Sequence, residues 1–230
     1  MDDRLQKSEA LLHEIAADDL GGRGCYLVQF SEVAAYEPRL RGGFAAAWTS
    51  PLMDLILADW LTKQGRWRGR GFATILHADL LPRWMEYCGA VLHEFAHFLT
   101  LPLPSDCQDE SIVDRSLELV GWLPLHWTEK NHRPETVRTV ATLPRWHEHG
   151  PSFVRACCHL VYRAQRTVYI RPEHLRFVTP YHPGHRVNED HFMQTLGDEL
   201  AITGSVRQIL TTPAPELFNQ LWKYATEATE

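Results

Sequence analysis

The sequence lacks the features that mark several large classes of protein. No apolar run approaches the roughly 18 residues that a membrane-spanning helix needs, and no segment is repeated. The first eight residues are polar and begin with acidic side chains, unlike a secretory signal peptide. The formal net charge of −6 disfavours a dedicated nucleic-acid-binding protein. We therefore expect a cytoplasmic protein that has neither a membrane nor a nucleic acid as its partner.

Cysteine is scarce, and its positions form no recognisable pattern. The chain has five cysteines, an odd number, and no CxxC pair, which argues against both a disulfide framework and a thiolate zinc site. What remains is an ordinary globular composition, with 44% hydrophobic and 23% charged residues among 230. This length suits one domain, or one domain with an appendage.

Apolar periodicity predicts an α+β fold in the first part of the chain. We expect strands at 25–30 and 72–76, and helices at 4–19, 51–62, 82–100, 109–120 and 151–167. Beyond residue 167, prolines separate short apolar pieces, and helices are predicted near 191–210 and 215–226. The sequence thus predicts an α+β domain over 1–167, the candidate catalytic domain, and a mostly helical C-terminal extension over 168–230.

The predicted helix 82–100 carries an HExxH motif, His93-Glu94-Phe95-Ala96-His97. Residues four apart lie on one face of a helix, so both imidazoles can reach a single metal ion. Zinc lowers the pKa of a bound water towards about 7, and a neighbouring carboxylate can accept its proton. We therefore predict that His93 and His97 bind zinc and that Glu94 activates a zinc-bound water. The neighbouring helix positions are apolar, so the motif should be buried, where unpaired polar groups are costly.

A catalytic zinc ion usually has three protein ligands, so a third should lie downstream. His149 precedes Gly150-Pro151, a pair that would begin a helix and fix the approach of the imidazole. Glu110 begins an ExxxD pattern on another predicted helix, but only a short loop with two prolines separates that helix from His97. The spacing favours His149, keeps Glu110 as the main alternative, and leaves residues such as His147 or Asp114 as less favoured ones.

Two sequence motifs together resemble those of a known protein family. The segment that contains HExxH, followed by His149-Gly150-Pro151-Ser152-Phe153, resembles the zincin-type metallopeptidases of the SprT-like kind, and more closely metallohydrolases that combine HExxH with HGPxF. The similarity covers roughly residues 70–165. It implies a zincin-like fold, a zinc ion, and His149 as the third ligand.

The expected activity is that of a zinc-dependent metallopeptidase, which hydrolyses peptide bonds in a protein or peptide substrate. One alternative keeps the metal but changes the substrate to a small molecule or a cell-wall fragment, which would make the protein an amidase. A second alternative is a non-catalytic binding module in which the zinc is structural, and four protein ligands would mark such a closed site. The sequence does not predict an oligomeric state.

The loop between residues 63 and 71 is basic and rich in glycine, with Arg66 and Trp67 among its members. Such a loop could hold phosphate groups or stack on a base. More often such a loop is simply solvated or tethers an acidic surface of its own protein, and we favour that interpretation.

Overall fold

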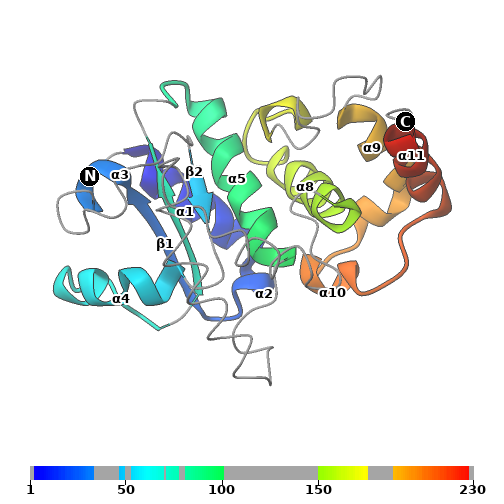
Figure 1. Cartoon of the computed structure of the whole chain (residues 1–230). Coiled ribbons are helices and arrows are strands. Elements are labelled where there is room, and N and C mark those ends of the chain that lie inside the picture. The colour runs from blue at the N-terminus through cyan, green and yellow to red at the C-terminus, as the bar shows by residue number, and fades with distance from the viewer. Residues whose placement is uncertain are drawn as a thin grey trace, which may run out of the picture.

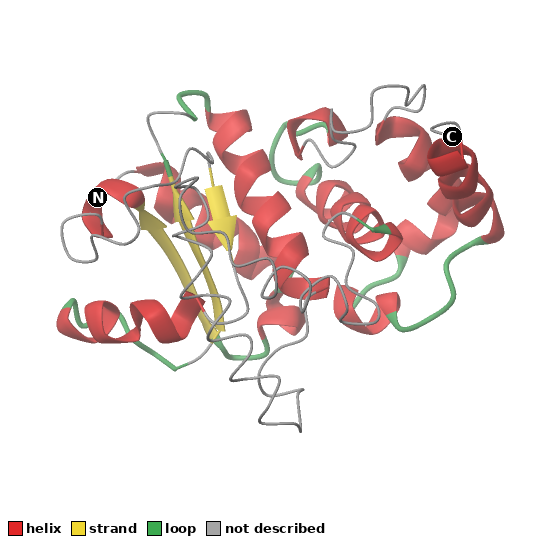
Figure 2. Ribbon diagram, viewed as in Figure 1, coloured by secondary structure: helices red, strands yellow, loops and turns green. Residues whose placement is uncertain are grey.

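The computed structural model describes residues 3–33, 47–49, 53–69, 71–77, 81–100, 150–175 and 189–227. Its strands are β1 (Gly24–Gln29), β2 (Ala47–Thr49) and β3 (Gly71–Leu76). Its helices are α1 (Asp3–Ile15), α2 (Ala17–Leu20), α3 (Phe30–Val33), α4 (Met53–Lys63), α5 (Trp84–Thr100), α8 (Pro151–Ala164), α9 (Glu189–Leu196), α10 (Val206–Leu210) and α11 (Glu216–Glu227), with 3-10 turns η3 (Pro172–Leu175) and η4 (Gly197–Ala201). The fold is a mixed one in which helices predominate (Figures 1 and 2).

The described strands form one small sheet in the order β1-β3-β2. β1 and β3 run parallel, with Gly24 opposite Gly71 and Gln29 opposite Leu76, while β2 is antiparallel to β3 and lies at the edge. The two glycines allow a close approach, because a Cβ at Gly71 would collide with the carbonyl oxygen of Gly24. This glycine pair therefore lets the two parallel strands start side by side.

Helices cover both faces of the sheet, as nearly continuous burial along β1 and β3 requires. Alternate strand residues divide between two cores. Cys25 and Leu27 of β1 join the larger core with α1, α5 and α8, whereas Tyr26 and Val28 join a smaller core with α4. Figure 2 shows that α8 to α11 lie on the far side of α5 from the sheet. Helix α5 therefore has the sheet on one side and the C-terminal helices on the other.

Two polar anchors tie the C-terminal helices to the rest of the molecule. The Asp19 carboxylate accepts hydrogen bonds from the backbone N–H groups of Val206 and Arg207 at the start of α10, both at 2.9 Å. The Arg207 guanidinium in turn donates to the carbonyl of Phe98 at 2.6 Å. That carbonyl belongs to the last turn of α5, where carbonyls have no partner within the helix. The end of α5 is thus capped from α10.

Most elements that the sequence predicts within the described residues are confirmed, including the helix of the HExxH motif. The predicted helix 191–210 is wrong as a single element, because the chain forms α9, η4 and α10 there. Gly197 and Gly204 interrupt it with φ angles of 50° and 96°, which lie outside the range of a right-handed α-helix. The predicted helix 109–120 lies outside the described residues, and the boundary near residue 167 stays a prediction.

The described helices include none that is both long and apolar enough to cross a membrane. The four cysteines that the structure describes are free and buried. Neither finding tests the expected cytoplasmic location, which stays a prediction.

Candidate metal centre

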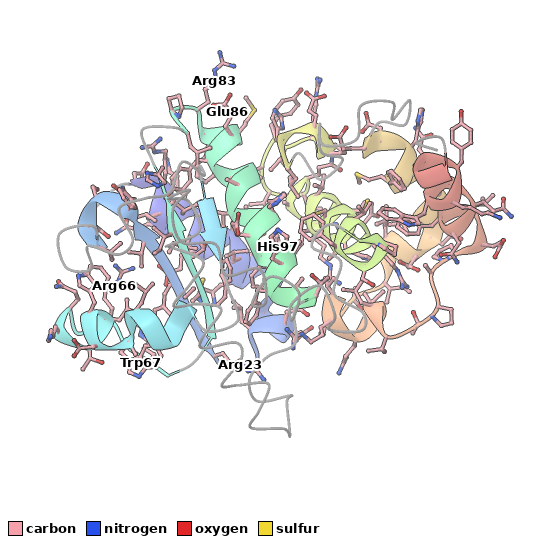
Figure 3. All side chains as sticks on the ribbon, viewed as in Figure 1. Arg23, Arg66, Trp67, Arg83, Glu86 and His97 are labelled. Atoms are coloured by element: carbon pink, nitrogen blue, oxygen red, sulfur yellow. The ribbon has the colours of Figure 1, made fainter. Side chains whose placement is uncertain are left out.

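The two motif histidines lie one turn apart on the side of α5 that faces α8. Their ring centroids are 4.9 Å apart, with an angle of 75° between the ring planes. Figure 3 shows His97 on the flank of α5 towards α8. His97 is 8% exposed, and His93 is half-buried. The helix repeat thus brings both imidazoles to one largely buried face, as the motif spacing predicts.

Phe153 of α8 contacts both imidazoles. Its ring is stacked on His97 at 4.3 Å between centroids with a 29° interplanar angle, and it meets His93 edge-on at 4.9 Å and 71°. The Phe153 side chain is only 1% exposed. It therefore holds the two rings in place and keeps water away from one side of the pair, which strengthens electrostatic interactions there.

A backbone carbonyl orients His93. Its Nδ1 lies 2.7 Å from the carbonyl oxygen of Leu175 in η3. A carbonyl oxygen can only accept a hydrogen bond, so Nδ1 must carry the proton. The lone pair of the neutral ring is then on Nε2, the nitrogen that can bind a metal. Metal-binding histidines commonly have such a partner on the nitrogen that faces away from the ion.

Glu94 is also buried, with 6% of its surface exposed. Its carboxylate is close enough to α8 to influence Cys157, a thiol with no exposed surface. Burial is the main reason why the pKa of Cys157 is raised, and the charges of Cys158 and Glu94 add to the effect. The position of Glu94 between α5 and α8, beside the histidine pair, is compatible with a role as a base.

Both candidates for a third ligand, His149 and Glu110, lie outside the described residues. Gly150, which follows His149 in the chain, is buried and precedes the first turn of α8. Its carbonyl accepts from the Val154 backbone N–H at 3.1 Å, while its own φ and ψ of −74° and −178° are extended, as is usual for the residue that caps the start of a helix. Within the described ranges, no three His, Cys, Asp or Glu side chains form a group that could hold a metal ion.

The two imidazoles nevertheless carry the kind of donor atom that zinc binds. Nitrogen ligands suit zinc, and the protonation of His93 at Nδ1 directs its Nε2 lone pair away from Leu175. Sequence reasoning found the two histidines and Glu94 but missed Leu175 and the contact of Phe153 with both rings. The carbonyl of Leu175 could not have been found, because every residue has a carbonyl and this one is 82 positions from His93. Phe153 carried a signal, since it is part of the HGPSF string.

The described part of the basic loop packs on its own protein. The Arg66 guanidinium donates to the carbonyl of Leu27 at 3.0 Å, and Trp67 stacks on Tyr26 at 5.3 Å between ring centroids. The Tyr26 hydroxyl accepts from the Arg68 backbone N–H at 2.7 Å. In Figure 3, Arg66 and Trp67 lie near α4, well away from His97. The described part of this loop therefore packs against the smaller core.

No family model, no curated protein and no solved structure matches this chain. Its function is therefore to be inferred from the residues themselves and from how the fold arranges them. Within the described part of the chain, that arrangement consists of two imidazoles, a buried carboxylate, a ring that packs on the imidazoles and a carbonyl that sets a tautomer.

Proposed function

We propose that the protein is a zinc-dependent metallopeptidase with a zincin-like fold, in which His93, His97 and His149 hold the zinc. The observation that carries this proposal is the hydrogen bond from His93 Nδ1 to the Leu175 carbonyl, at 2.7 Å. A merely structural histidine needs no particular tautomer, whereas a zinc ligand needs a lone pair on the nitrogen that faces the ion. The packing of Phe153 against both imidazoles adds rigidity to the same pair.

Glu94 is the residue that moves protons in this proposal. Its carboxylate accepts a proton from the attacking water and then delivers it to the leaving amine. The buried position of Glu94 keeps competing bulk water away from it. A bound zinc ion would supply Lewis acidity, which acidifies water and polarises the carbonyl of the substrate.

The edge strand favours a peptide over a small molecule as the substrate. β2 lies against α5, and β3 pairs with one of its edges (Figure 1). An extended peptide can add a strand to such an edge through backbone hydrogen bonds, without a requirement for particular side chains. An amidase for a small molecule has no use for a strand edge, which is why we place it second. A structural zinc site gives no reason for the buried Glu94 beside the histidines, which is why we place it third.

The test combines metal analysis with one substitution. The purified protein should contain about one zinc per chain. Glu94→Gln should keep the zinc and lose hydrolysis of unfolded casein, because the carboxylate is a base and not a ligand. The control is Glu86→Gln on the same helix, whose carboxylate lies 3.8 Å from the Arg83 guanidinium and away from His97 (Figure 3). Absence of zinc after incubation with the metal at neutral pH contradicts the proposal.

The third ligand has its own test. His149→Ala should weaken zinc binding, and Glu110→Gln should leave it unchanged. The reverse result would move the third ligand to Glu110 and relate the site to a different group of zincins.

A further inference from the structure

Helix α5 and the turn η3 approach each other unusually closely at Gly89. A Cβ at this position would collide with the carbonyl oxygen of His174 and would lie 2.7 Å from its carbonyl carbon. Both are backbone atoms, which cannot rotate away as the end of a side chain can. Glycine within a helix is less favourable than alanine, so its presence at position 89 calls for a local reason. The contact with His174 supplies that reason.

This close contact lies directly beside the hydrogen bond that orients His93. Gly89 and His93 are four residues apart and so share a face of α5. On η3, His174 and Leu175 are consecutive, so the residue that touches Gly89 is next to the residue whose carbonyl accepts from His93 Nδ1 at 2.7 Å. Any side chain at position 89 would have to push η3 outwards, and the Leu175 carbonyl would move with it.

The turn η3 is itself held in place, so the carbonyl is presented in one position. Pro172 and Leu175 are buried, and the turn packs on α8 and α9 as well as on α5. The Nδ1 atom of His174 accepts from the Arg171 backbone N–H at 2.9 Å, and the backbone N–H of His174 donates to the Arg171 carbonyl at 3.0 Å. These contacts would therefore resist a shift of η3. Because position 89 has no side chain, α5 can pack against η3 without such a shift.

We propose that Gly89 is a positioning residue of the candidate metal centre. It lets η3 come close enough for the Leu175 carbonyl to hold His93 with its proton on Nδ1 and its lone pair on Nε2. This inference rests on the proposed function, because the tautomer matters most for a residue that binds metal. It assigns a role in the centre to a residue outside the HExxH motif and to a turn beyond residue 167.

The first experiment examines the metal-free wild-type protein. Long-range ¹⁵N–¹H correlation spectra of the histidine rings, recorded at about pH 8, distinguish the two neutral tautomers. His93 should appear as the Nδ1–H tautomer, and the loss of its signals in His93→Gln assigns them. This measurement needs neither zinc nor activity. A His93 ring in the Nε2–H tautomer overturns the inference, whatever the substituted proteins do.

The second experiment compares Gly89→Ala with Ala90→Gly. Ala90 is the next helix position, about 100° around the axis, and the change there weakens the helix without adding a Cβ towards η3. Zinc affinity is measured by competition with a fluorescent chelator. Gly89→Ala should bind zinc about 10–100-fold more weakly, as substitutions of residues that orient metal ligands do. Ala90→Gly should bind zinc as the wild type does, although its helix is weakened.

The outcomes separate this inference from the proposed function. If the wild-type protein binds no zinc, the proposed function fails, and the tautomer still reports on Leu175. If the wild type binds zinc and Gly89→Ala binds it equally well, the positioning role is overturned while the function stands. If Gly89→Ala does not fold, η3 cannot yield to a side chain at position 89, as the close contact with His174 requires. The tautomer in the wild-type spectrum then decides whether the Leu175 carbonyl holds His93.

Discussion

Substitution of Arg155 by methionine should destabilise the protein strongly, although Arg155 belongs to no motif. Its guanidinium makes two 2.8 Å hydrogen bonds to the Glu199 carboxylate, with 4% of the arginine and 10% of the glutamate side chain exposed. It also donates to the carbonyls of Thr212 at 2.8 Å and Ile209 at 3.2 Å. The bonds join α8, whose Phe153 contacts both motif histidines, to η4 and the end of α10.

The expected loss of stability follows from the Glu199 charge that the substitution leaves without Arg155. Removal of one partner of a buried ion pair costs about 3–5 kcal/mol, because the other charge stays buried without compensation. Glu199 keeps its hydrogen bond from His159 Nε2, at 2.9 Å, and is not wholly buried, so we expect the lower end of that range. A loss of about 3 kcal/mol is a large share of the roughly 5–15 kcal/mol by which native proteins are stable.

The measurement is unfolding in urea followed by circular dichroism, with linear extrapolation of the free energy of unfolding to water. The matched control is Arg163→Met on the same helix, since Arg163 bonds the carbonyls of Ile15 at 3.1 Å and Ile202 at 3.3 Å and no buried carboxylate. That control should cost only about 1 kcal/mol. The double variant Arg155→Met with Glu199→Gln should recover part of the loss, because the buried charge is then gone. If Arg155→Met costs no more than Arg163→Met, the reasoning is refuted.

Three further predictions concern acid, backbone packing and thiols. Burial lowers the pKa of His159 below 6.5, so the stability that its neutral form contributes is complete above pH 6.5 and is lost as the pH falls below it. Burial acts to raise the pKa of Glu199, but hydrogen bonds from Arg155 and His159 outweigh it and hold that pKa below 4.5. Acid therefore also removes the stability that the ionised Glu199 contributes. Between about pH 7.5 and 5.5, the free energy of unfolding in urea should fall less for His159→Gln than for the wild type. Gly71→Ala should destabilise by more than about 1 kcal/mol in the same assay, because its Cβ would collide with the Gly24 carbonyl, and an unchanged urea midpoint would contradict this. A folded Cys107→Ser variant should resist alkylation by iodoacetamide at about pH 8 until it is unfolded, because burial raises the pKa of its four remaining thiols. Rapid alkylation of the folded variant would count against the burial of these thiols.

Local sequence patterns predicted the elements on which the candidate centre stands. The helix of the motif was predictable because its apolar positions recur at helical spacing between Pro82 and the prolines that follow Thr100. Helix α8 was predictable from Gly150-Pro151, which starts it as expected. Strands β1 and β3 were predictable from short apolar runs bounded by glycines. In each case, the signal and the structure it specifies lie in the same stretch of chain.

What the sequence could not predict depends on contacts between distant segments. The edge strand β2 has only three residues, and its pairing with β3 is visible only in the fold. Gly197 and Gly204 break a helix that apolar periodicity alone would continue, since periodicity carries no information on a positive φ angle. The hydrogen bond from His93 to Leu175 has a backbone carbonyl as its acceptor, which no residue type signals.

The segment beyond residue 167 bears directly on the candidate centre at both ends of the HExxH motif. At the first histidine, η3 supplies the Leu175 carbonyl that determines which ring nitrogen of His93 carries the proton. Directly after the second histidine, Arg207 caps the carbonyl of Phe98 and is itself held by Asp19 from the N-terminal part of the chain. An HExxH helix gives two imidazoles on one face, but it gives neither their tautomers nor a fixed helix end. Those two properties come from residues that the motif does not contain, so the chemistry proposed for the motif depends on the packing of η3 and α10 around it.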